Sequence, residues 1–197
     1  MNKRWIWVGS IVVWAALVSA GIAGLARYSM TPGQAGRSPH DWPADVPFHP
    51  TDRELTLVVS IHPHCPCSRA TLAELAKLTA RHPGKISAFV LLTKPADTPG
   101  DWERGDAFDI ARKIPITRVL TDQDGAWAKK FGAATSGQTF AFDASGRLRF
   151  SGGMTASRGH EGDNAGSDAI AALLLAGQPK TDRTPVFGCP LGECPER

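Results

Sequence analysis

The fold is decided by residues 55–93, which read LTLVVSIHPHCPCSRATLAELAKLTARHPGKISAFVLLT. The run Leu55–Ile61 is short, apolar and rich in β-branched residues, which predicts a buried strand. Apolar residues then recur at helical spacing, with residues 71–74 as a candidate capping box. Residues 85–93 form a second apolar run after a Pro-Gly break. Strand, helix and strand in this order predict a βαβ unit with parallel strands and a right-handed crossover.

The rest of the chain extends this unit. Further strands are predicted at residues 116–120, 139–143 and 147–150. Further helices are predicted at residues 102–113, 126–131 and 167–176. The last two strands form a hairpin, and Gly177 is the natural C-cap of the last helix. Parallel strands followed by an antiparallel hairpin predict an α/β three-layer sandwich of thioredoxin type over residues 55–177.

The N-terminus carries an uncharged apolar run, residues 5–26, directly after Lys3 and Arg4. The run reaches the roughly 20 residues that a bilayer core requires. The two basic residues predict a cytoplasmic N-terminus and a single-pass signal anchor over residues 1–27 in the inner membrane. The alternative is a cleaved signal peptide, with Val18-Ser19-Ala20 as the cleavage pattern. Either way the domain is exported to the periplasm or extracytoplasmic space, where disulfides persist.

Two segments flank the predicted domain. Residues 28–54 are rich in proline and predict an extended linker that holds the domain off the membrane. Trp42 and Phe48 are candidates for fixing the second half of this linker to the domain surface. Residues 178–197 form a tail that contains cysteines.

Length and charge limit the classes of function. The chain has 197 residues, the size of one compact domain with appendages. Its net charge is +3, and the lysines and arginines are scattered without a basic run. A nucleic-acid partner is therefore not expected.

Four cysteines fall into two close pairs, Cys65/Cys67 and Cys189/Cys194, a pattern that indicates redox chemistry or metal binding. The first pair lies where a strand ends and a helix begins, so the helix N-terminus stabilises a thiolate there. Pro66 suits the first helical position, which would place Cys65 at the N-cap. A later helix start would leave both cysteines in the loop and weaken the activation.

The one-residue spacing predicts a strained, labile bridge, because a Cys-Pro-Cys disulfide distorts the preferred geometry. The expected activity is thiol–disulfide exchange on protein cysteines or with a membrane redox partner, without a cofactor. Cys65 is expected to attack and Cys67 to resolve. Cys189 and Cys194 form either a local structural disulfide or a resolving pair that recharges the first. A bridge between one cysteine of the first pair and the tail pair is a further alternative.

The histidines beside the motif leave a second hypothesis open. His62 and His64 flank two thiols, and thiolates with imidazole suit Cu(I). A Sco-like copper chaperone would use Cys65, Cys67, His64 and the distant His160. Otherwise, His62, His64, Pro66 and His160 are candidate modulators of the thiolate, or His160 is a loop side chain that caps the last helix.

Three segments resemble the membrane-anchored, thioredoxin-fold proteins of RedB type. They are residues 57–75, which contain HPHCPC, residues 137–166 and residues 184–191. The resemblance implies the fold and a redox role but no substrate. Ordinary thioredoxins have a Cys-x-x-Cys pair and a cis-proline facing the site, whereas this chain has Cys-x-Cys and a Gly137-Gln138 turn. This departure argues against substrate recognition by the usual backbone pairing.

Overall fold

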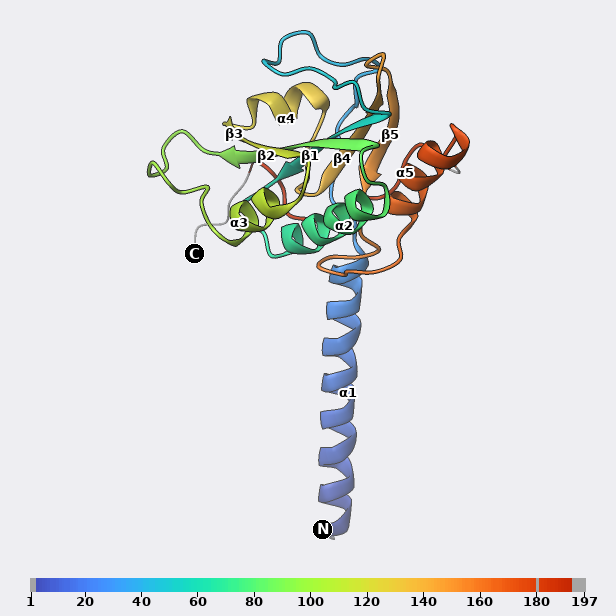
Figure 1. Cartoon of the computed structure of the whole chain (residues 1–197). Helices are drawn as coiled ribbons and strands as arrows, with labels where there is room; N and C mark the ends of the chain where they lie inside the picture. The colour runs from blue at the N-terminus through green and yellow to red at the C-terminus, as the bar shows by residue number, and fades with distance from the viewer. Residues whose placement is uncertain (1–2, 180, 193–197) are drawn as a thin grey trace. The chain divides into compact units, whose positions relative to one another are not determined.

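The computed structural model describes residues 3–179 and 181–192, and the chain divides into two compact units, Met1–Thr31 and Pro32–Arg197. The first unit contains helix α1, Lys3–Met30 (Figure 1). Within Arg4–Met30 a window of 18 residues has a mean hydropathy of 2.1, so the helix is long and apolar enough to cross a membrane. Signal anchors and signal sequences share this property.

The second unit is built on a five-stranded sheet in the order β3-β2-β1-β4-β5 (Figure 1). The strands are β1 Leu55–Ile61, β2 Ile86–Lys94, β3 Thr117–Gln123, β4 Gln138–Asp143 and β5 Leu148–Gly153. Neighbouring strands β1, β2 and β3 are parallel, and β4 and β5 form an antiparallel hairpin beside β1. The predicted mixed α/β fold is therefore confirmed.

Helices cover both faces of the sheet (Figure 1). The helices of one face are α2 Cys67–Arg81, α3 Asp106–Lys113 and α5 Ala165–Ala176. The other face carries α4, Ala126–Phe131. Because side chains alternate along a strand, Leu57 and Val59 belong to the first apolar core and Val58 to the second.

Two predicted helix starts are wrong. The helix predicted over 102–113 begins only at Asp106, because residues 99–104 form two consecutive turns. In these turns the Trp102 N–H donates to the Pro99 carbonyl and the Arg104 N–H donates to the Asp101 carbonyl. The capping box at 71–74 is absent, because α2 begins earlier, at Cys67. Glu74 is instead buried inside α2 and accepts a hydrogen bond from the Gly162 N–H.

Residues 28–54 are expected from the sequence to form an extended linker. Residues 32–54 instead belong to the second compact unit. Phe48 is buried, and Trp42 makes edge contacts with four aromatic rings. The Trp42 backbone N–H also donates to the Gly146 carbonyl, and its indole N–H donates to the Phe48 carbonyl. Burial of these aromatic side chains accounts for the packing of the segment, since each removes a large apolar area from water.

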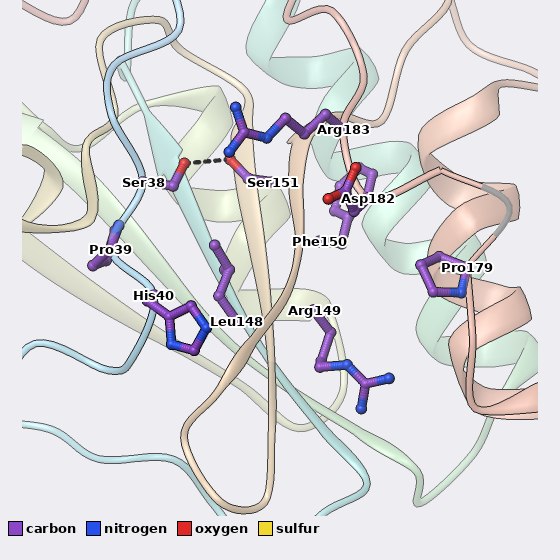
Figure 2. Close-up of a pocket in the computed structure, with 10 residues that line it drawn as sticks. All are labelled: Ser38, Pro39, His40, Leu148, Arg149, Phe150, Ser151, Pro179, Asp182 and Arg183. Carbon is purple, nitrogen blue, oxygen red and sulfur yellow. Dashed lines mark hydrogen bonds between the residues drawn. The ribbon is translucent and has the colours of Figure 1, made fainter.

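The free edge of β5 is covered by two segments from opposite ends of the domain. The Leu148 N–H donates to the His40 carbonyl at 2.9 Å, and the Ser151 N–H donates to the Asp182 carbonyl at 2.9 Å. Figure 2 shows residues 38–40, residues of β5, Pro179, Asp182 and Arg183 around a cavity, with a hydrogen bond between Ser38 and Ser151. The volume of the cavity is about 420 Å³. None of the described residues that line this cavity is a cysteine.

The short helix α4 depends on a carboxylate from the preceding strand. Asp122 is fully buried, and its two oxygens accept hydrogen bonds from the Trp127 and Ala128 N–H groups at 2.8 Å. Asp122→Ala is expected to lower the free energy of unfolding by about 1–2 kcal/mol, since it leaves these amides without their cap. Urea denaturation checks this, with the exposed Asp97→Ala as control. Equal stability of the two variants would contradict the capping role.

Candidate functional site

The first cysteine pair lies at the N-terminal end of α2, immediately after β1. Cys65 and Cys67 are both buried, with 4% and 9% of their surface exposed. The Cys65 N–H donates to the His62 carbonyl, and the Ser68 N–H donates to the Cys65 carbonyl. Pro66 occupies the N-cap position of α2 rather than the first helical position. Cys65 therefore lies one residue before the N-cap and not at the N-cap as predicted. Because Pro66 already has helical dihedrals (φ −61°, ψ −27°), Cys65 still faces the start of α2.

The tail brings a third cysteine to this point. The Cys65 and Cys189 sulfur atoms are 2.9 Å apart although 124 residues separate them in the chain. The Ser136 N–H donates to the Cys189 carbonyl at 2.8 Å, and Thr135 pairs with Pro190 as an antiparallel bridge. The tail therefore runs beside the loop that precedes β4. Cys194, the second member of the predicted tail pair, lies outside the described residues.

Cys65 and Cys67 have opposite electrostatic environments. A hydrogen bond from Cys67 lowers the pKa of the Cys65 thiol to about 4, and a second one from Cys189 adds to this against the effect of burial. The pKa of Cys67 is raised, because its proton is engaged in that hydrogen bond and because it is buried. Cys65 is therefore the thiolate, and Cys67 holds a proton beside it.

His62 fixes the loop that carries the cysteines. Its backbone N–H donates to the Ser136 hydroxyl at 2.9 Å, and its carbonyl accepts from the Ser68 hydroxyl at 2.9 Å. The two hydroxyls are themselves 2.9 Å apart. Burial lowers the pKa of the His62 imidazole, while the nearby Cys65 opposes this shift. A neutral, buried His62 therefore lies beside the thiolate.

His64 is exposed and contacts the loop before α3. Its Nε2 lies 2.9 Å from the Trp102 carbonyl oxygen, and the two rings are 4.5 Å apart. Trp102 also makes an edge contact with the His62 ring at 5.5 Å. Trp102, Ser68 and Ser136 are site residues that sequence reasoning missed, since no local pattern distinguishes them from ordinary helix, loop or surface positions.

The predicted copper ligands are not gathered into one cluster. His160 is exposed in the loop after β5. Within residues 3–179 and 181–192, no group of three or more His, Cys, Asp or Glu side chains is arranged to hold a metal ion. The sulfur atoms of Cys65 and Cys189 are instead brought into contact with each other.

Comparisons with known proteins give the fold. No protein-family description and no curated protein matches this chain. A hypothetical protein from Sinorhizobium meliloti is similar in structure, with a TM-score of 0.61 and 22% identity over 85% of this chain and 97% of that one. An uncharacterized conserved protein from Geobacillus kaustophilus has a TM-score of 0.58 and 20% sequence identity, over 85% of this chain and 95% of that one. A thioredoxin-like superfamily protein has a TM-score of 0.43 and 16% sequence identity, over 81% of this chain and 99% of that one. The first two likenesses establish a shared fold.

Proposed function

We propose that this protein is a thiol–disulfide oxidoreductase that acts on protein cysteines outside the cytoplasm, with Cys65 as the central reacting sulfur. The observation that carries the proposal is the Cys65 sulfur at the start of α2, 2.9 Å from the Cys189 sulfur and hydrogen-bonded by Cys67. A stabilised thiolate beside a second thiol is the arrangement that disulfide exchange requires.

The chemistry follows from this arrangement. A thiolate of this chain attacks a partner disulfide, one partner sulfur leaves as a thiolate, and a mixed disulfide forms on the attacking cysteine. A second thiolate of this chain then attacks that cysteine's sulfur and releases the other partner thiolate, so that a disulfide that includes Cys65 forms within the chain. Two electrons pass from the chain to the partner, and the same steps run in reverse when the partner is a dithiol.

The membrane context belongs to the same proposal. We infer that α1 is retained as a signal anchor with its N-terminus in the cytoplasm and its domain outside. The uncharged run after Lys3 and Arg4 supports this orientation. The HPHCPC segment and the tail, residues 184–191, support placing the chain with RedB-type proteins. The expected partners are protein thiols or a membrane redox protein.

Loss of exchange activity in a Cys65→Ser variant tests the function. The full-length chain in detergent micelles is expected to catalyse disulfide exchange with insulin, and Cys65→Ser is expected to reduce the rate to background. Ser157→Ala, in the loop after β5, is the control and should keep the wild-type rate.

A wild-type rate in Cys65→Ser would contradict the proposal. The same preparation is titrated with Cu(I). Stoichiometric binding that is lost in a His62→Ala/His64→Ala double variant, together with no exchange activity, would favour the copper chaperone instead.

A further inference from the structure

We propose that the redox-active disulfide of this protein joins Cys65 to Cys189, and that a partner's thiol enters at the Cys189 sulfur. This inference rests on the proposed function and extends it. It makes Cys189 the sulfur that exchanges with the partner and Cys65 the sulfur that forms or leaves the internal disulfide, whereas the sequence predicts Cys65 to attack and Cys67 to resolve and leaves a bridge to the tail as an alternative.

The tail is fixed on both sides of Cys189. Before it, the buried Val186 carbonyl accepts a hydrogen bond from the Gly33 N–H at 2.8 Å. After it, the Leu191 N–H donates to the Ala134 carbonyl at 3.0 Å, and the Leu191 side chain is buried in the second core. Cys189 is therefore presented to Cys65 by an ordered backbone.

Gly188 permits this close approach. A Cβ atom at Gly188 would lie 2.0 Å from the Ser136 carbonyl oxygen, so any larger residue must displace the tail. The Gly188 carbonyl accepts a hydrogen bond from the Arg158 guanidinium. The absence of a side chain here thus serves to bring the tail against the loop before β4.

Geometry favours Cys189 over Cys67 as the disulfide partner of Cys65. The Cys65 and Cys189 sulfurs lie 2.9 Å apart, so a disulfide of about 2.05 Å needs a movement of roughly 1 Å. A Cys65–Cys67 bridge would instead have to close across Pro66, whose dihedrals are helical, and would strain the preferred disulfide geometry.

Exposure decides which sulfur a partner reaches. Cys65 is only 4% exposed, whereas Cys189 is half-buried. A cavity of about 490 Å³ is lined by Gly188 and Pro190, the two neighbours of Cys189, although Cys189 itself does not line it. The greater exposure of Cys189 is therefore the reason to expect a partner thiolate at its sulfur rather than at Cys65.

A partner thiolate attacks the Cys189 sulfur, the Cys65–Cys189 bond breaks, and Cys65 leaves as a thiolate. A low pKa of the leaving thiol speeds this step, and the Cys67 hydrogen bond supplies it. The partner's second thiolate then attacks the partner sulfur that is bonded to Cys189, which closes the partner's disulfide and releases Cys189 as a thiolate. The partner dithiol gives up two electrons and two protons. One proton is taken by Cys189 and the other goes to solvent.

Disulfide mapping tests this assignment on the full-length chain in detergent. The protein is oxidised with diamide, alkylated, digested and analysed by mass spectrometry. A Cys65–Cys189 link is expected in the wild type and in the Cys67→Ser and Cys194→Ser variants. A dominant Cys65–Cys67 link, or a Cys189–Cys194 link with Cys65 alkylated, would overturn the inference.

A matched glycine pair separates the position of the tail from the general effects of substitution. Gly188→Ala is expected to reduce the yield of the Cys65–Cys189 link, while Gly192→Ala, where a Cβ meets nothing within 4 Å, keeps it. Equal yields would contradict the role of the docked tail.

Exchange with insulin distinguishes this inference from the proposed function. Cys189→Ser is expected to fall to the background rate of Cys65→Ser. If Cys189→Ser keeps the wild-type rate while Cys65→Ser is inactive, the function stands and the inference fails. To locate the entry point, the oxidised protein is treated with reduced glutathione and quenched with acid. The glutathione adduct is expected on Cys189, and an adduct on Cys65 would contradict entry at Cys189.

Discussion

Replacing Cys67 with alanine is expected to raise the pKa of the Cys65 thiol from about 4 most of the way to its ordinary value. The hydrogen bond from Cys67 is the largest cause of the depressed pKa, and alanine removes it without adding bulk. At a pKa of about 8.5, on the order of one thiol in three hundred is ionised at pH 6. The reactivity of Cys65 at that pH should fall accordingly.

Two measurements on the reduced full-length chain check this expectation. Thiolate absorbance against pH gives the pKa, and the rate of iodoacetamide labelling at Cys65 gives the reactivity. Cys67→Ser restores a hydrogen-bond donor and should recover part of the shift. An unchanged pKa in Cys67→Ala would assign the stabilisation to the α2 N-terminus and Cys189 instead.

The same pKa makes the stability of the reduced protein depend on pH. The folded-state pKa of Cys65 lies below that of the unfolded chain, so the unfolded state binds more protons between about 4 and 8.5. The contribution of Cys65 to stability is complete above the unfolded pKa and is lost as the pH falls towards 4. Cys67→Ala should flatten this dependence.

Phe131→Ala is expected to lower the free energy of unfolding by about 3–5 kcal/mol, the cost typical of a fully buried aromatic side chain. Phe131 is 0% exposed and its ring contacts those of Trp42, Phe48, Phe140 and Phe142. The variant therefore loosens both the sheet face under α4 and the attachment of the segment before β1.

Urea denaturation followed by circular dichroism measures the effect. Leu175→Ala is a suitable control, since that side chain is 76% exposed and surface changes typically stay within about 0.5 kcal/mol. A loss below about 1 kcal/mol in Phe131→Ala would show that the aromatic cluster repacks around the gap.

Local patterns in the sequence predicted most of the sheet and helices. The run Leu55–Ile61 and the helix Ala126–Phe131 were placed at their observed bounds, because an apolar β-branched run and a terminal glycine are both local signals. The strand predicted over 116–120 ends too early, since β3 continues through Thr121, Asp122 and Gln123, polar residues that carry no strand pattern. Apolar periodicity therefore predicts buried strands and helices, and it underestimates the length of an edge strand such as β3.

The sequence predicts the local part of the site, and it leaves the link between Cys65 and the tail as one of several alternatives. The junction position of Cys65 and Cys67 follows from the chain order of one strand and one helix. The contact between Cys65 and Cys189 depends on hydrogen bonds between the tail and the loop at Ser136, two segments with no shared pattern. Trp102 reaches His64 because a turn replaces the expected helix start. Long-range contacts of this kind have no local signal in a single sequence.

The covering of β5 also limits how other chains can associate with this domain. An uncovered edge strand offers a row of N–H and C=O groups to which a foreign strand can add. Here the Leu148 and Ser151 N–H groups are already bonded to the His40 and Asp182 carbonyls. Strand addition at this edge, in a partner complex or in aggregation, would first have to displace one of the two covering segments.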